Sequence, residues 1–347
     1  STSVAIVTSA FPIQERGKAI GYTVSAVYLG LSMGPFIGGI LTENFGWRSL
    51  FISSVLMGIF SAFITVLING EWAEAKNEKM DYIGTVIYAL SLSMAIYGFS
   101  LLPSFQGAGF ILFGTIFILI FIYWEVKFDS PMLNVRIFRK NSGFTFSNMA
   151  ALIHYSATFG ITFLLSLYLQ YIKDLGPQKA GLILLSQPLI MAIFSPYAGK
   201  LSDRVEPRVV ATSGMCITFI GLLIFSFLNK NTSIVIIVLN SILVGLGYAF
   251  FSSPNMNSIM SSVEKKFYGI ASAMVGTMRL IGQMMSMAIS MVVFALIIGR
   301  VGITPEYYSV FLSAVKIAFS IFTGLSFAGI FASYYRGNIR KDSNSNH

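Results

Sequence analysis

Long apolar runs alternate with short polar connections along the chain, and this pattern predicts membrane-spanning helices. Most runs reach the roughly 18 residues that mark a helix able to cross a bilayer. The opening apolar segment, residues 1–11, is shorter, since eleven helical residues rise only about 16 Å, or half a bilayer core. Ten full spans are expected after it, at residues 19–41, 49–69, 82–102, 109–128, 144–170, 180–199, 209–228, 234–257, 269–298 and 310–333.

The composition is that of a membrane protein. Of the 347 residues, 55% are hydrophobic and only 11% are charged, and the mean hydropathy is +0.75. Soluble domains carry about 25% charged residues. We therefore expect an all-α, polytopic membrane bundle in contact with the lipid bilayer. The single cysteine, Cys216, excludes an internal disulfide and lies in an apolar run, where a small packing residue is expected.

Lysine and arginine gather on alternate connections. Sixteen of the 23 lie in one set of loops and five in the opposite set, while Arg279 and Lys316 fall inside spans. Because cytoplasmic loops carry the basic excess, the first set and the C-terminus should be cytoplasmic. The net charge of +9 therefore does not indicate nucleic acid as a partner. All fourteen acidic residues lie in loops or at span ends, with Asp81 and Glu125 at the margins.

The segment GLSMGPFIGG, residues 30–39, places four glycines and a proline inside a predicted span. Gly30, Gly34 and Gly38 recur every four residues, so they share one helix face, where small side chains let another helix approach closely. Pro35 lacks an N–H and bends a helix. A bent, closely packed helix suits a hinge between two bundles; the alternative is a fixed packing or dimerisation face. Gly39 completes the segment.

This segment resembles a known family motif. Together with Gly46-Trp47-Arg48, it is similar to the antiporter motif in the fifth span of drug exporters of the major facilitator superfamily. One departure lies upstream, where the family's glycine falls at Tyr22 and Gly21 is one place away. The resemblance implies a carrier built from two helical bundles that rock about a central cavity.

A second stretch, GKLSDRVEPR at residues 199–208, resembles the G-x-L-x-D-R-x-G-x-R loop of the same superfamily. The matching positions are Gly199, Leu201, Asp203, Arg204 and Arg208. Glu206 replaces the usual glycine. The Asp203 carboxylate can cap a helix N-terminus or pair with a basic group on a neighbouring helix, which would latch one conformation. The alternative is an ordinary solvated turn.

Three further stretches extend the resemblance over nearly the whole chain. Residues 125–144, 163–182 and 269–283 are similar to parts of the fourteen-span drug–proton antiporters, the EmrB/QacA type. An internal repeat agrees, because residues 15–21 parallel residues 264–271, as in proteins built from two parallel halves. On that numbering the chain begins inside span four and lacks spans one to three. The alternative is removal of an initiator methionine before a surface segment.

The same numbering divides the chain into four parts. Residues 1–70 would be a remnant of the N-terminal bundle (part of span four, then spans five and six), and residues 71–128 two linking spans. Residues 129–333 would form a C-terminal six-span bundle, and residues 334–347 a disordered cytoplasmic tail. We expect a monomer.

A few polar side chains are predicted at membrane depth. Arg279 lies about ten residues into its span, where arginine usually marks a pathway or a charge pair; the alternative is snorkelling to the cytoplasm. His154 suits a proton relay or a hydrogen-bonded packing role, and Lys316 should snorkel outward. Neutral candidates for substrate contact or interhelical hydrogen bonds are Gln187, Gln283, Asn148, Asn240, Asn255 and Asn257.

The sequence shows no metal-ligand cluster, phosphate loop or nucleophile–base pair, so we expect neither an enzyme nor a cofactor. The resemblance implies proton-coupled export of amphipathic drugs or toxic small molecules across the cell membrane by alternating access. In similar proteins the coupling carboxylate lies in the first span. Two alternatives stay open. One is a truncated fragment without transport, and the other is a uniporter or solute permease of the same superfamily, for which Arg279 would favour anions.

Overall fold

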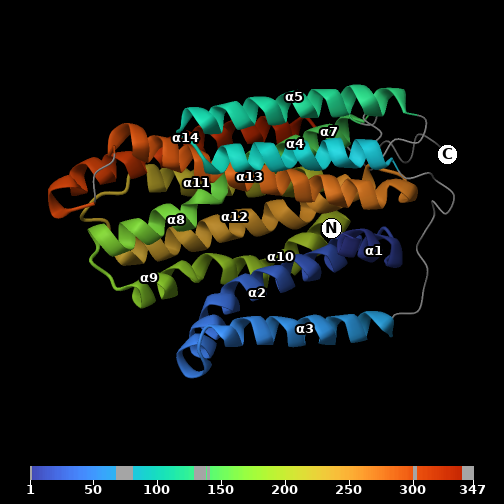
Figure 1. Cartoon of the computed structure of the whole chain (residues 1–347). Helices are drawn as coiled ribbons and strands as arrows, with labels where there is room; N and C mark the ends of the chain where they lie inside the picture. The colour runs from blue at the N-terminus through green and yellow to red at the C-terminus, as the bar shows by residue number, and fades with distance from the viewer. Residues whose placement is uncertain (1, 68–80, 129–137, 139–140, 300–302, 338–347) are drawn as a thin grey trace.

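The protein is a bundle of α-helices (Figure 1). The computed structural model describes residues 2–67, 81–128, 138, 141–299 and 303–337, and every regular element within these ranges is helical. The α-helices are α1 (Thr2–Ala10), α2 (Arg16–Phe45), α3 (Arg48–Val66), α4 (Tyr82–Ser100), α5 (Phe105–Lys127), α7 (Ser142–Thr158), α8 (Gly160–Leu167), α9 (Pro177–Leu184), α10 (Ser186–Arg204), α11 (Pro207–Ser226), α12 (Ile234–Ser261), α13 (Tyr268–Ile297) and α14 (Tyr308–Tyr334). The short turns are η1 (Tyr168–Ile172, π-helical), η2 (Lys265–Phe267) and η3 (Pro305–Tyr307).

The predicted membrane architecture is confirmed. In the described ranges, nine helical segments are long and apolar enough to cross a membrane. They begin at α3 and correspond to nine of the ten expected spans. The remaining expected span, 19–41, lies inside α2, an unbroken helix of 30 residues. The short opening segment forms α1.

Two spans expected to be continuous are interrupted. The span predicted at 144–170 consists of α7, α8 and the π-helical turn η1. At its first break, the Gly160 N–H donates to the Ser286 hydroxyl of α13 at 2.8 Å, so a side chain from another helix takes the place of the usual carbonyl acceptor. The span predicted at 180–199 runs from 177 to 204 as α9 and α10, which meet at Leu185.

Helices α7 to α14 form one packed bundle, and the N-terminal helices lie against it (Figure 1). Helix α2 packs along α10 and also contacts α12, whereas α4 and α5 form a hairpin whose first helix contacts α13. Helix α3 packs against α2 at the edge of the molecule, and none of its residues is buried. The interface between α2 and α10 is called the seam below.

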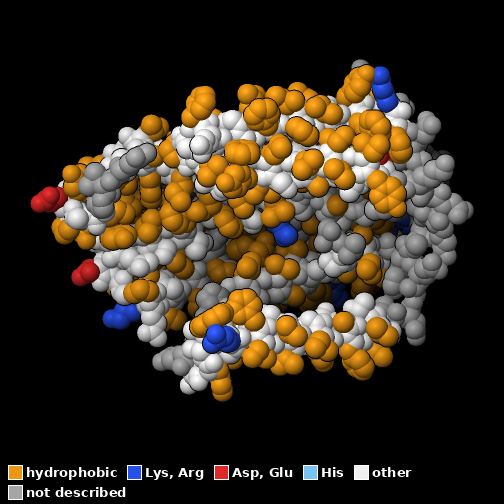
Figure 2. Space-filling view, in the orientation of Figure 1, with side chains coloured by type: hydrophobic (Ala, Val, Ile, Leu, Met, Phe, Trp, Pro, Cys, Tyr) orange, Lys and Arg blue, Asp and Glu red, His pale blue; other side chains and the backbone are white. Residues whose placement is uncertain are grey.

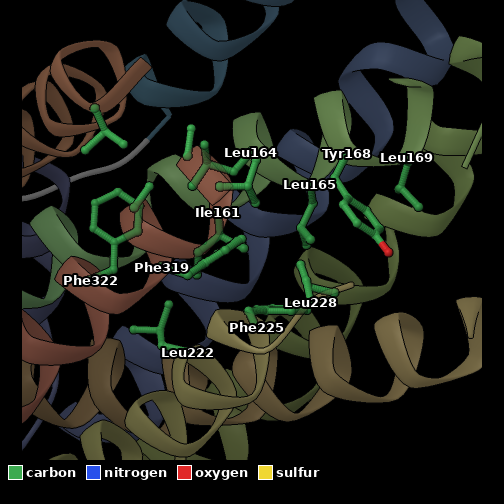
Figure 3. Packing of buried hydrophobic residues seen from close by; sticks show 14 of the residues in the cluster. Ile161, Leu164, Leu165, Tyr168, Leu169, Leu222, Phe225, Leu228, Phe319 and Phe322 are labelled. Atoms are coloured by element: carbon green, nitrogen blue, oxygen red, sulfur yellow. The ribbon is translucent and has the colours of Figure 1, made fainter. Parts of the chain in front are cut away.

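The largest hydrophobic cluster lies inside the α7–α14 bundle (Figure 3). It brings Ile161 and Leu164 of α8 against Leu222 of α11 and Phe319 of α14, all fully buried. The outer surface is also rich in hydrophobic side chains (Figure 2), as expected for helices that face lipid rather than water. Association therefore depends on close packing rather than on a difference in hydrophobicity.

Glycines provide that close packing where backbones touch. A methyl group on Gly214 of α11 would lie 2.5 Å from the backbone nitrogen of Phe251 on α12. One on Gly247 of α12 would lie 2.7 Å from the backbone nitrogen of Thr218 on α11. Neither position has room for a Cβ, so the two helices approach one another through paired glycines.

The two carboxylates predicted at span ends, Asp81 and Glu125, are buried. A position at a span end does not by itself predict burial. Asp81 and Glu125 are only 3% and 2% exposed. The Asp81 side chain caps α4 by accepting from the Gly84 N–H at 2.8 Å, and it also accepts from the Trp124 indole at 3.0 Å. The connection before Asp81, residues 68–80, lies outside the described residues.

The predicted disordered tail begins too early at residue 334. Arg336 is 1% exposed, and its guanidinium donates to Asn255 Oδ1 of α12 at 2.8 Å and to the Ser333 carbonyl at 2.8 Å. Asn255 in turn donates to the Ser147 carbonyl of α7 at 3.2 Å. Burial of the guanidinium, and to a smaller extent repulsion from Arg208, lowers the pKa of Arg336 to about 9. Residues 338–347 lie outside the described ranges.

We expect Gly214→Ala to destabilise the bundle by about 1–3 kcal/mol, because the added methyl group forces the backbones of α11 and α12 apart. The matched control is Gly324→Ala on the exposed face of α14, where nothing lies within 4 Å of the added carbon. This control should gain up to about 1 kcal/mol from helix propensity. Thermal unfolding of the purified variants in detergent measures both, and equal shifts would contradict the paired-glycine contact.

Candidate functional site

The seam is closest near the N-terminus of α2. A methyl group on Gly17 would clash with the Gly199 carbonyl of α10, and one on Gly199 would clash with the Gly17 carbonyl. One turn further along α2, a methyl group on Gly21 would lie 2.6 Å from the Ser195 carbonyl. Helices from the two predicted bundles are therefore in backbone contact at this end.

Asp203 closes the same end of the seam. Its carboxylate accepts from the backbone N–H of Gly17 at 2.7 Å and from that of Lys18 at 2.8 Å. These are N–H groups of the first turn of α2, which have no partner inside the helix. The negative charge also lies favourably at the positive end of the helix dipole. Of the readings open from sequence, the structure shows the helix cap.

Polar groups of α10 and α12 surround this cap. The Asn257 amide donates to the Ser202 hydroxyl at 3.0 Å and to the Asp203 carboxylate at 3.5 Å. The Ser253 hydroxyl donates to the Gly17 carbonyl at 3.4 Å. Asn257, a candidate for substrate contact, therefore belongs to the seam. We call Asp203, Ser202, Asn257 and Ser253, with the start of α2, the latch.

The two arginines of the 199–208 stretch, Arg204 and Arg208, are not part of the latch as defined. Arg204 is exposed at the end of α10. The Arg208 guanidinium instead lies over the ring of Tyr334 on α14, 4.9 Å from its centroid, a cation–π distance. The stretch therefore links α10 to α2 through its aspartate and α11 to α14 through its last arginine.

The glycine face of residues 30–39 is open in the described structure. Nothing lies within 4 Å of a methyl group placed on Gly30 or Gly34, and one on Gly38 meets only a Leu50 side-chain carbon at 3.6 Å. The close helix approach expected at Gly30 and Gly34 is thus wrong for the described residues; Gly17 and Gly21 make it instead. The surroundings of Pro35 and Gly39 lie outside the described part, so the hinge stays a prediction.

Three tyrosines, from α2, α7 and α12, meet beside the seam. The rings of Tyr28 on α2 and Tyr155 on α7 lie 5.7 and 5.9 Å from the ring of Tyr248 on α12. The Tyr28 hydroxyl donates to the Ser252 hydroxyl at 3.3 Å. This tyrosine group joins α2 to two helices of the α7–α14 bundle. Our sequence analysis missed it, although tyrosines inside spans are a usable signal, because each hydroxyl needs a polar partner.

His154 lies beside the tyrosine group and is fully buried. Its ring stacks on Phe251 at 4.1 Å and meets Tyr248 edge-on at 4.7 Å. Neither ring nitrogen has a hydrogen-bond partner among the described residues. The hydrogen-bonded packing role considered from sequence is therefore not found there, and the proton relay stays a prediction.

Arg279 lies on α13 near the tyrosine group. It is exposed, and it interacts electrostatically with Tyr28 and Tyr248. No carboxylate in the described ranges forms an ion pair with it. The two glutamine candidates are partly buried, Gln283 one turn beyond Arg279 and Gln187 near the start of α10. A positive charge beside aromatic rings at membrane depth offers contacts for an aromatic or anionic guest.

We expect Asp203→Asn to open the latched end of the seam, because it removes the charge and one acceptor from bonds worth about 1.5–3 kcal/mol each. The readout is labelling of Ser253→Cys by a membrane-impermeant maleimide in a Cys216→Ser background. The rate should rise about tenfold, which corresponds to 1.4 kcal/mol. Glu264→Gln, which removes an exposed ion pair with Lys266, is the control. Equal rates in all variants would contradict the latch.

Comparison with known proteins matches one family over most of the chain. The family described as Major Facilitator Superfamily matches residues 1–287 and, in an overlapping match, residues 147–346. The chain is 31% identical over 283 residues to the riboflavin transporter RibZ of Clostridioides difficile, covering 80% of this chain and 61% of that protein. It is 27% identical over 294 residues to the multidrug resistance protein Stp of Mycobacterium tuberculosis, covering 83% and 54%.

A third relative is the lincomycin resistance protein LmrB of Listeria innocua, 24% identical over 292 residues, with 82% of this chain and 61% of that protein covered. The chain thus spans 54% to 61% of the length of these relatives. The family match extends over most of the sequence, and the helical membrane bundle is the architecture expected for it. This chain belongs to the major facilitator superfamily of membrane transporters.

Proposed function

We propose that this chain acts in a secondary transporter that exports amphipathic small molecules in exchange for protons. The observation that carries the proposal is the latch, in which Asp203 of α10 caps α2, and the proposal assigns these two helices to different bundles. An inter-bundle contact made of a few hydrogen bonds can form and break as the bundles rock. Two relatives are named for resistance to drugs, Stp and LmrB, which supports export.

In this proposal the latch lies at the cytoplasmic end, which the excess of Lys and Arg in the loops on that side supports. From Gly17 to Tyr28, α2 rises about 16 Å, so the tyrosine group lies near the middle of the membrane. With the latch closed, the cytoplasmic end of the seam is blocked. Breaking the Asp203 bonds separates the two helices there and admits a cytoplasmic molecule to the tyrosine group.

In this proposal the tyrosine group and Arg279 contact the transported molecule. Aromatic rings stack on flat apolar molecules and attract lipophilic cations, whereas the Arg279 guanidinium attracts carboxylate or other anionic groups. The guest is therefore an aromatic compound with polar substituents. Gln187 and Gln283 are further candidates for polar contacts with it.

Proton coupling requires a titratable group within the membrane. Among the described residues, His154 is a buried titratable group beside the tyrosine group, and we assign it a relay role. Fourteen-span antiporters, which the sequence resembles, place a coupling carboxylate in the first span, and the curated relatives are longer than this chain. Whether this chain transports a molecule by itself and whether that transport is coupled to protons are therefore tested separately. The competing hypothesis is that this chain does not transport on its own.

A second candidate is a transporter of a flavin-like vitamin, a permease rather than a drug exporter. It is favoured by the 31% identity to a protein named as a riboflavin transporter. Riboflavin has a flat ring system that would suit the tyrosine group. Proteoliposomes containing this chain separate the candidates. If the chain is an exporter, an imposed proton gradient drives a cationic aromatic dye against its own concentration gradient. If it is a permease, riboflavin equilibrates without an imposed proton gradient.

We expect Arg279→Gln to weaken binding of an anionic aromatic dye about tenfold or more, because a hydrogen bond to a charged group contributes about 1.5–3 kcal/mol. Binding of a cationic dye should stay equal or improve. Fluorescence titration of the purified chain measures both. Lys316→Gln, which removes a charge from α14, is the matched control and should change neither. If Arg279→Gln leaves the anionic dye unaffected, Arg279 does not contact the guest.

A further inference from the structure

A cavity outside the seam lies at the end of the α11–α12 hairpin. It has a volume of about 200 Å³ and is lined mainly by apolar side chains, among them Phe225, Leu228 and Ile237. Those three are at most 3% exposed and belong to the large cluster of the α7–α14 bundle. Figure 3 shows Phe225 and Leu228 at the edge of that cluster. Tyr28 and Arg279 are not among its lining residues, so it is separate from the proposed transport site.

One buried polar atom of the lining lacks a partner. Asn240 is 4% exposed, and its Nδ2 donates to the Gly221 carbonyl at 2.8 Å. Its Oδ1 has no hydrogen-bond partner in the part of the chain that the structure describes. The other polar side chain of the lining is Thr232, whose hydroxyl already accepts from the Asn229 N–H at 3.0 Å. Asn240 Oδ1 is thus a buried hydrogen-bond acceptor without a donor among the described residues.

The size and lining favour an organic guest over water. A buried water needs two to four polar partners, whereas an engineered apolar cavity of about 150 Å³ in another protein stays dry and binds benzene. The present cavity is slightly larger, and one of its lining residues, Asn240, carries a buried acceptor that has no partner among the described residues. A benzene-sized ring that carries one hydroxyl satisfies both features.

The cavity opens toward lipid. Two of its lining residues, Phe227 and Ile236, are 72% and 49% exposed, and both are hydrophobic. They lie on the outer surface of the hairpin, which is a membrane-facing surface if α11 and α12 span the bilayer. A lipophilic molecule dissolved in the membrane can therefore enter without passing through the seam.

We propose that this cavity binds small lipophilic phenols from the bilayer. The ring packs between Phe225, Leu228 and Ile237, and the phenol O–H donates to Asn240 Oδ1. The same molecule without its hydroxyl leaves the Asn240 acceptor unpaired and binds more weakly. The site is lateral to the proposed transport route, so its occupation does not depend on transport.

The test measures binding of 4-fluorophenol and fluorobenzene to the purified chain in lipid nanodiscs by fluorine NMR. Wild-type protein should bind 4-fluorophenol more tightly, after correction for partition into empty nanodiscs. Asn240→Leu keeps a similar volume and removes the acceptor, so it should weaken 4-fluorophenol about fivefold, the value of one typical hydrogen bond, and leave fluorobenzene unchanged. Asn231→Leu, an exposed asparagine on the same connection, is the matched control and should change neither.

Ile236→Trp blocks the mouth from an exposed position and should abolish binding of both probes, which keeps the proposal testable if Asn240→Leu misfolds. Circular dichroism and size-exclusion chromatography check each variant. The proposal is overturned if wild-type protein binds the two probes equally, or if Ile236→Trp retains them. It is equally overturned if folded Asn240→Leu binds 4-fluorophenol as wild type does.

Discussion

The structure depends on backbone contact between helices in a solvent that offers them no hydrophobic reason to associate. Lipid chains are as apolar as leucine, so helices hold together where small residues let their backbones touch and polar groups meet. Gly17 against Gly199 joins α2 to α10, and Gly214 with Gly247 joins α11 to α12. The Asp203 cap adds hydrogen bonds at the first of these contacts. The proposed rocking motion requires the bonds of this cap to break.

The general fold follows from sequence because the bilayer imposes a simple rule. A segment of sufficient length and hydropathy must be helical, since its backbone groups have no other partners. The apolar runs therefore predict the helices to within a few residues, and the matches at Gly199 and Asp203 fall where α10 contacts α2. An apolar run does not show where a side chain from a neighbouring helix replaces a hydrogen bond inside the helix, as the Ser286 hydroxyl does at Gly160.

The candidate site was harder to anticipate, because it depends on which residues meet across helices far apart in sequence. Spacing predicts that Gly30, Gly34 and Gly38 share a face, yet in the described structure Gly17 and Gly21 carry the close contact. Tyr28, Tyr155 and Tyr248 come from three separate helices, and no local pattern connects them. The polar residues selected from sequence by residue type therefore lie in different places: some in the latch, some near the tyrosine group and some in interhelical packing.

Arg336 has a consequence for how the protein is made. Its guanidinium supplies the donor for Asn255, which belongs to α12 and itself bonds to α7. The ribosome adds this arginine after every helix that it ties together, so this contact forms only once α7, α12 and α14 have all been made. A nascent chain that stops before it leaves the Asn255 oxygen without this donor.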